Sequence, residues 1–127
     1  MNDRGVTLIE IIIAMVILTG VLLGMGGFAV NFTRTVSRSD ARTIAVNLAA
    51  QRISDIRATP NYSGLETTFN GTEASITGFS GYTRATTIVR TGGPRPTSTN
   101  DYKTVTVSVT APGITAPITK TIVVAAP

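Results

Sequence analysis

The 127-residue chain contains no histidine and no cysteine, and only 6% of its residues are aromatic. Without histidine there is no imidazole for a catalytic triad or a metal site. Without cysteine there is no disulfide framework and no thiolate metal site. The carboxylates Glu66, Glu73 and Asp101 stand singly, without the dense spacing of a calcium loop. We therefore expect no enzyme, no cofactor and no metal site. One alternative stays open, an ion bound by an acid and the carbonyl groups of the 91–101 loop.

The charge of the chain is positive, with a formal net charge of +4 at pH 7. A basic balance is common among nucleic-acid-binding domains. Here the arginines between Arg34 and Arg57 are interspersed with acids, and no basic surface with interleaved aromatic residues is present. We expect no nucleic-acid partner. Arg34, Arg38 and Arg42 recur at steps of four, which fits a solvated helix face or a contact with acidic neighbours or lipid headgroups.

A long apolar run extends from Val6 to Val30, about 25 residues. As a helix it would measure about 38 Å, enough to cross a hydrocarbon core of about 30 Å with some tilt. One carboxylate, Glu10, lies near the start of this run. Placing an acid in a bilayer costs a few kcal/mol even on lenient scales. A simple anchor has no use for it, so we expect Glu10 to have a specific positive partner.

The residues that open this run follow a known order. A short polar leader, Met1 to Arg4, precedes Gly5, and the apolar helix then begins with Val6, Thr7, Leu8, Ile9 and Glu10. This arrangement resembles the class III signal of type IV prepilins and type II secretion pseudopilins. The resemblance implies cleavage after Gly5 by a membrane aspartic prepilin peptidase and N-methylation of Val6. It also implies that Glu10 pairs with the amino terminus of a neighbouring subunit. The family usually has phenylalanine or methionine where this chain has Val6.

The resemblance implies a structural role. The chain would be a minor pilin of the pilus-modification kind or a minor pseudopilin. It would sit in the cytoplasmic (inner) membrane as a single-pass protein with its C-terminal domain outside the cytoplasm. It would then enter a type IV pilus or a type II secretion pseudopilus. The implied partners are other pilin or pseudopilin subunits, the prepilin peptidase, the inner-membrane assembly platform and membrane lipid. A different class of function also stays open, a membrane-tethered β-domain that binds a ligand or surface and does not polymerise.

Two other interpretations of the N-terminus compete with this one. A secretory signal peptide is disfavoured, because the apolar run is about twice the usual length and no Ala-x-Ala site follows it cleanly. An ordinary signal anchor is the second. The arginines from Arg34 to Arg42 outnumber Arg4, so the positive-inside rule would place the C-terminal part in the cytoplasm. The prepilin resemblance implies the opposite orientation.

Four glycines lie late in the apolar run, at Gly20, Gly24, Gly26 and Gly27. The first two form a small-xxx-small pair, which allows close packing between helices in a membrane. Each glycine also weakens a helix by about 1 kcal/mol relative to alanine. The segment could therefore either pack closely against neighbours or partly melt in a filament.

The helical period continues beyond the run with a polar and an apolar face. The apolar face comprises Ala41, Ile44, Ala45, Leu48, Ala49, Ile53 and Ile56. Arg52 projects into this face, and we expect it to extend along apolar surface to reach water. Pro60 disfavours a helical conformation at Thr59, so the helix should end near Ala58. The expected divisions are a leader (1–5), a membrane half (6–30) and an amphipathic half (31–58) of one helix, and a β-domain (59–127).

The remaining sequence has the composition of strands and turns. Asn70-Gly71 predicts a hairpin between Glu66–Phe69 and Glu73–Thr77. Three further strands are predicted at 82–90, 102–110 and 118–124, with 91–101 as a long connection. In the second of these Lys103, Val105, Val107 and Val109 share one face. The helix stripe must cover that face. The expected fold class is α+β, a long N-terminal helix packed on a small antiparallel meander, as in pilins.

Overall fold

A computed structural model describes residues 5–93 and 100–127 of the chain. Its elements are, in order, α1 (Leu8–Ala58), α2 (Leu65–Phe69), β1 (Gly71–Glu73), β2 (Thr83–Gly92), β3 (Asp101–Thr110) and β4 (Ile118–Ala125). The chain divides into two compact units. The first ends at Ser37, and the second, which we call the globular unit, extends from Arg38 to Pro127. The second unit contains the last part of α1 and all the strands. This arrangement confirms the predicted α+β class.

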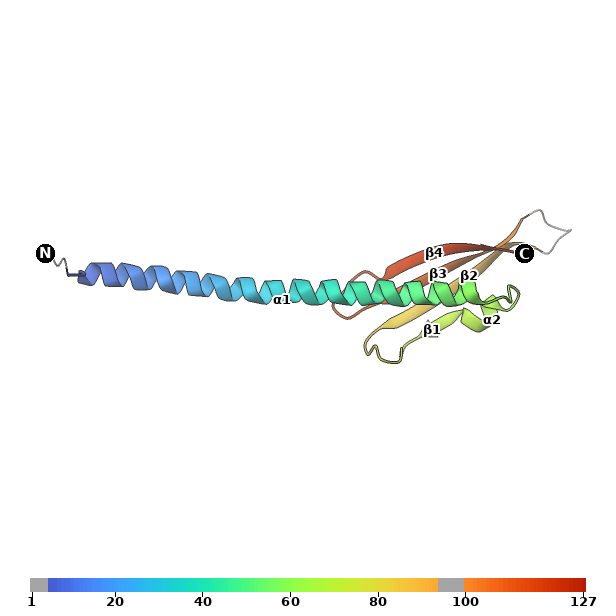
Figure 1. The fold of residues 1–127 in the computed structure, drawn as a ribbon, viewed down its shortest axis with the longest axis horizontal. Coiled ribbons are helices and arrows are strands. Elements are labelled where there is room, and N and C mark those ends of the chain that lie inside the picture. The colour runs from blue at the N-terminus through green and yellow to red at the C-terminus, as the bar shows by residue number, and fades with distance from the viewer. Residues whose placement is uncertain (1–4, 94–99) are drawn as a thin grey trace. The chain divides into compact units, whose positions relative to one another are not determined.

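The sheet has four strands in the order β1-β2-β3-β4, and every neighbouring pair is antiparallel (Figure 1). The three long strands therefore form the predicted meander. Val105 in the middle of β3 lies opposite Ile88 of β2 and Ile122 of β4. Thr91 and Gly92, expected in the connecting loop, instead continue β2 and pair with β3, so the connection is shorter than predicted. The intervening residues 94–99 lie outside the described part of the chain, and the proposed loop ion is not tested there.

The core lies between α1 and the inner face of the sheet. The buried helix residues are those predicted from the 3.6-residue period, namely Ala41, Ala45, Leu48, Ala49, Ile53 and Ile56, with Ile44 half-buried beside them. Val105, Val107 and Val109 on the inner face of β3 have no exposed surface. These side chains of α1 and the valines of β3 belong to one buried cluster. The prediction that α1 covers the valine face is confirmed.

The outer face of the sheet carries hydroxyl groups instead. Thr106 and Thr121 lie side by side on β3 and β4 with their hydroxyl oxygens 3.3 Å apart. Thr119 and Ser108 repeat this relation at 3.5 Å. Threonine suits a solvated strand face because its branched side chain fits the pleat and its hydroxyl accepts and donates hydrogen bonds.

The helix ends where the sequence predicted, at Ala58. The backbone N–H of Thr59 donates to Ile56, and the Thr59 hydroxyl donates to the Asp55 carbonyl oxygen at 2.9 Å. Pro60 has no N–H and cannot continue the ladder. Arg57 lies in the last turn, where a cation interacts favourably with the helix dipole.

The predicted hairpin around Asn70-Gly71 is wrong. The segment before it forms the short helix α2, because Leu65 is needed in the core, where only 1% of it is exposed. Asn70 closes this helix by donating its N–H to Glu66. Its side-chain oxygen accepts the N–H of Ile88, just beyond the stretch of β2 that β1 covers. Asn70 therefore fixes α2 against β2 rather than turning the chain back on itself.

Replacing Ile56, which is 1% exposed at the helix–sheet contact, tests this packing. Ile56→Ala should lower the free energy of unfolding by about 2–5 kcal/mol. The measurement is urea denaturation of the full chain in detergent, followed by tyrosine fluorescence, because all three tyrosines lie in the globular unit. Val123→Ala, at a side chain that is 63% exposed, is the control and should change stability by under about 1 kcal/mol. Equal effects of the two substitutions would contradict the packing described here.

Candidate functional site

The expected cleavage site lies outside the helix. The Thr7 carbonyl accepts the first N–H bonds of α1, from Glu10 at 3.1 Å and Ile11 at 3.3 Å. Gly5 and Val6 precede that turn, are exposed, and belong to no helix or strand. A Cβ atom added at Gly5 would meet nothing within 4 Å. The Gly5–Val6 peptide bond is thus accessible backbone that need not unwind before a protease reaches it.

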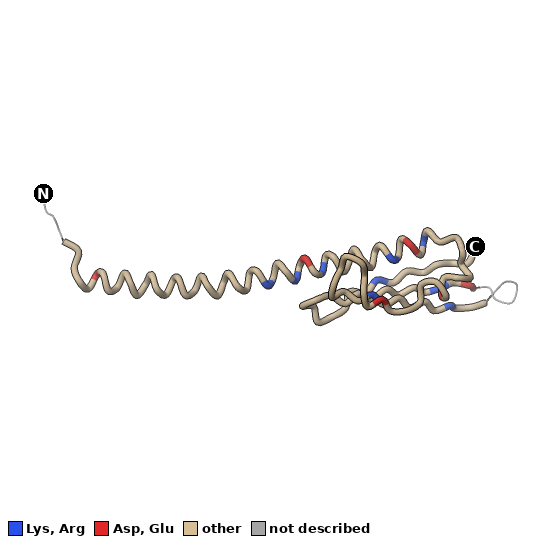
Figure 2. The backbone as a smooth tube through the Cα atoms, turned by 90° about the horizontal axis from the view of Figure 1, so that it is seen from below, with Lys and Arg blue, Asp and Glu red and all other residues tan. Residues whose placement is uncertain are grey.

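Glu10 lies in the first turn of α1, where the partial positive charge of the helix N-terminus favours an acid. Its side chain is exposed, and among the described residues it forms no ion pair. No other charged residue follows until Arg34 (Figure 2). The large apolar side chains of this stretch are exposed as well, for example Leu23 at 75% and Phe28 at 72%. The helix is long and apolar enough to cross a membrane.

Thr19, a polar residue within the apolar run, is satisfied by the helix itself. The Thr19 hydroxyl donates to the Met15 carbonyl at 2.7 Å, one turn earlier. The backbone remains helical through all four glycines from Gly20 to Gly27. A Cβ atom at any of them would meet nothing within 4 Å. Whether these glycines serve close packing or melting in a filament stays a prediction.

The globular unit contains an ion-pair cluster that sequence reasoning missed. Glu73 at the end of β1 forms salt bridges with Arg52 of α1 and with Arg84 of β2. Arg84 Nε donates to the same carboxylate at 2.7 Å, and its guanidinium also donates to the Leu48 carbonyl at 3.2 Å. The Arg52 guanidinium lies 5.4 Å from the ring centre of Phe69. The sequence did not predict this partner: the Arg52 side chain, 12% exposed, meets the Glu73 carboxylate, whose side chain is 40% exposed, rather than free solvent.

A buried lysine holds the segment after α1 against the sheet. Lys103 is 1% exposed on the inner face of β3. Its ammonium donates to the Tyr62 carbonyl at 2.7 Å and lies 3.4 Å from the Glu66 carboxylate. It also lies 4.6 Å from the ring centre of Tyr62. The alternation of the strand places Lys103 on the same face as the buried valines. This was the one signal in the sequence that the Lys103 ammonium is buried and needs partners within the fold.

The third cluster joins Asp101 to the end of β2. Arg90 donates to both carboxylate oxygens of Asp101, at 2.8 and 2.6 Å, and the Tyr62 hydroxyl donates to one of them at 3.0 Å. The bonds from Arg90 lower the pKa of Asp101 most; burial opposes this and the Tyr62 bond adds to it. Burial, followed by the contact with Asp101, raises the pKa of Tyr62. For Glu73, burial is the largest effect and raises the pKa, but the bonds from Arg84 and Arg52 hold it below its usual value.

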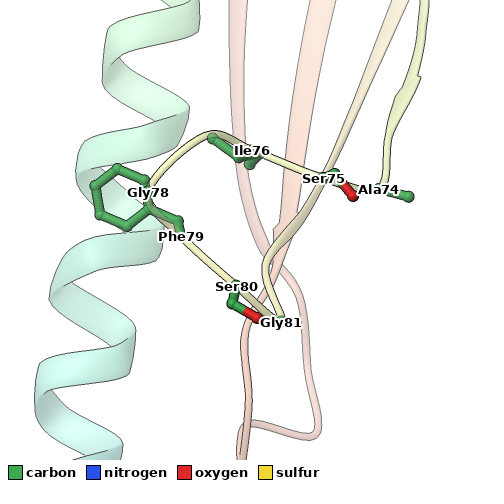
Figure 3. A pocket seen from close by; sticks show the side chains of 7 residues that line it. All are labelled: Ala74, Ser75, Ile76, Gly78, Phe79, Ser80 and Gly81. Carbon is green, nitrogen blue, oxygen red and sulfur yellow. The ribbon is translucent and has the colours of Figure 1, made fainter.

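These clusters join elements rather than present reactive groups. Among the described residues no group of three histidine, cysteine or acidic side chains could hold a metal ion. The loop between β1 and β2 forms a shallow pocket, and Phe79 turns its ring toward α1 (Figure 3). The pocket is lined by Ala74, Ser75, Ile76, Gly78, Phe79, Ser80 and Gly81, none of which has an acidic or a basic side chain. The N-terminal segment is the candidate functional site.

Comparison with known families points to the same segment. A model of the prokaryotic N-terminal methylation motif matches residues 1–26. This motif is characteristic of type IV prepilin-like proteins, whose family is structural rather than catalytic. The motif supports a type IV pilin-like or pseudopilin-like protein, and the long helix packed with an antiparallel sheet is a pilin-like arrangement. No curated protein and no solved structure matches the chain.

The pKa shifts predict how stability depends on pH. The carboxyls of Glu73 and Asp101 have lowered pKa values in the fold, against ordinary values of 4.5 and 3.8. Above about pH 5 both carboxyls are ionised in the folded and in the unfolded chain, and their full contribution to the stability of the fold is present. As the pH falls below the ordinary pKa values, the unfolded chain binds protons before the folded chain does. The contribution of the two carboxylates to stability is then lost as the pH falls through their lowered pKa values in the folded chain. The Tm should thus be nearly constant from about pH 7 to pH 5 and fall below about pH 4.

The variant Glu73→Gln isolates one part of this dependence. It should lower the Tm at neutral pH and reduce the acid decline, because it removes one carboxylate that must stay ionised. Asp55→Asn is the matched control, an exposed acid with no ion pair in the described part of the chain. Differential scanning calorimetry from pH 7 to pH 3 would measure both. An acid decline as steep in Glu73→Gln as in the unaltered chain would contradict the role of this ion pair.

Proposed function

We propose that the protein is a minor pilin or minor pseudopilin, a structural subunit of a type IV pilus or a type II secretion pseudopilus. A prepilin peptidase cleaves after Gly5, Val6 becomes the new N-terminal residue and is methylated, and the apolar half of α1 holds the chain in the cytoplasmic membrane. The assembly platform then transfers the subunit into a filament. The globular unit remains outside the cytoplasm throughout.

The observation that carries this proposal is the lone acid in an unpartnered apolar helix. Glu10 lies in the first turn of α1, shortly after the exposed Gly5–Val6 bond and within the segment that the methylation motif matches. Leu8 and Ile9 are exposed beside it, and Thr7 supplies the carbonyl that starts α1. A dry charge pair is strong, because neither group has water to replace its partner. An amino group released at Val6 of a neighbouring subunit is a suitable cation.

The size of the globular unit fits a minor subunit. Only about 70 residues follow α1, and the chain has no cysteine with which to close a C-terminal loop. In the described part of the chain β2, β3 and β4 form a simple antiparallel meander. The competing function, a membrane-tethered β-domain that does not polymerise, lacks a use for Glu10 and for the matched motif.

Cleavage is tested by determining the mature N-terminus. Protein purified from a host that expresses a prepilin peptidase should begin at Val6, and mass spectrometry should show one added methyl group on its amino nitrogen. Gly5→Leu should leave the leader in place, because the larger side chain obstructs the peptidase. An intact Met1 in protein that still functions, or a start beyond Gly27, would favour the tethered or secreted domain instead.

Assembly is tested by Glu10→Ala. The variant should still reach the membrane, because removing an acid only increases the apolar character of the run. Its amount in sheared filaments should fall at least about tenfold, the effect of losing about 1.4 kcal/mol of pairing energy. Asp40→Ala, an exposed acid on the same helix outside the apolar run, is the control and should assemble normally. Normal incorporation of Glu10→Ala would refute the pairing role.

A further inference from the structure

The sheet has one long open edge. β4 is the last strand in the sheet order and contains eight residues without proline or glycine (Figure 1). The other edge strand, β1, has only three residues. An edge strand presents unpaired N–H and C=O groups along one side, which are a template for another extended chain. The backbone of β4 is therefore able to accept one more strand.

A groove follows this edge, between β4 and the end of α1. It is lined by Ala50, Ile53, Ser54, Arg57, Lys120, Thr121 and Ile122. The core is less completely covered here than at β3, because Ile122 and Val124 on the inner face of β4 are only half-buried. On β3 the corresponding inner valines are fully buried. An added strand would cover the apolar side chains that β4 leaves partly exposed.

The groove is positively charged. Arg57 and Lys120 both line it, no acidic residue does, and in the described part of the chain neither cation has a hydrogen-bond or ion-pair partner. The cations Arg84, Arg90 and Lys103 of the neighbouring strands, by contrast, are all paired with acids. The helix dipole accounts for Arg57 alone. No acid of residues 5–93 and 100–127 pairs with Lys120, which shares the inner face of β4 with Ile122.

Charge decides which occupant fits. Two copies joined edge to edge through β4 would bring their Lys120 side chains and their Arg57 side chains together, and like charges at an interface are costly. An inward-pointing lysine on an edge strand is a known device against self-association. A partner with carboxylates at the same place would gain instead, so the edge favours an acidic chain over a second copy.

We propose that β4 and the adjoining groove bind an extended acidic segment of another protein by adding a strand to the sheet. Backbone hydrogen bonds along β4 hold the segment. One of its carboxylates lies between Arg57 and Lys120, and a neighbouring apolar side chain covers Ile53 and Ile122. This binding site lies wholly in the globular unit and does not depend on whether the chain assembles into a filament.

The test uses the full isotopically labelled chain in detergent micelles and a synthetic peptide of about ten residues, in which threonine and valine alternate around two central glutamates. The matched peptide has glutamines in place of the glutamates. NMR should show shift changes and slower amide exchange along β4 with the acidic peptide. The glutamine peptide should bind about three- to tenfold more weakly, the range for losing one or two exposed ion pairs.

Substitutions of the two cations test whether the acidic peptide binds in the groove. Arg57→Gln combined with Lys120→Gln should weaken binding of the acidic peptide to the level of the glutamine peptide and abolish its salt dependence. The fold should persist, because neither residue is in an ion pair among the described residues. Arg42→Gln, an exposed cation of α1 that does not line the groove, is the control and should bind normally.

Three results would overturn the proposal. The first is no shift change along β4 at millimolar peptide. The second is equal affinity for the acidic and the glutamine peptides. The third is self-association through β4 without any peptide, seen as concentration-dependent line broadening confined to Ile118–Ala125, which would make a second copy the occupant.

Discussion

The contact between the apolar stripe of α1 and the valine row of β3 is the interaction on which the globular unit depends. The sheet is a single layer, so without the helix its inner face would meet water. Val105, Val107 and Val109 have no exposed surface, and the stripe from Ala41 to Ile56 provides their cover. A unit this small has little other apolar surface to bury. The end of α1 is therefore part of the core, while its N-terminal half finds no apolar partner within its own unit.

Charges fix the position of this contact. The Arg84 guanidinium reaches across from β2 to the Leu48 carbonyl of α1, a residue 36 positions away. Lys103 does the same for the Tyr62 carbonyl, 41 positions away. Apolar contacts are non-directional, whereas a buried guanidinium or ammonium must meet its acceptors or lose several kcal/mol. We interpret the Arg84 bond as a feature that sets the register of α1 on the sheet, and the Lys103 bond as one that holds the segment after α1 in place.

The sequence predicts the long elements well and the short ones poorly. The period of burial repeats several times in α1 and in β3, so one irregular residue does not hide it. α2 and β1 are too short for any period, and the glycine after Asn70 imitates a hairpin turn although Leu65 and the Ile88 N–H require otherwise. The partners of Arg52 and Lys103 are distant in sequence, and only the folded chain brings them together. The N-terminal segment is the opposite case, because its signal is local and a family model matches it.

The two ends of α1 leave opposite charges without a partner, and this bears on what the chain contacts. In the globular unit Glu66, Glu73 and Asp101 are all taken up by cations of the fold. None of these three acids is left to pair with Arg57 and Lys120, and no acidic residue lines the groove beside β4. In the apolar run the situation is reversed, because Glu10 is the only charged residue between Val6 and Val30. A chain that folded for itself alone would gain by removing both imbalances, the acid because it is costly in lipid and the cations because they face an open strand edge. On the function proposed here, other chains supply what is missing: an amino group for the acid in the membrane, and a carboxylate for the cations outside it.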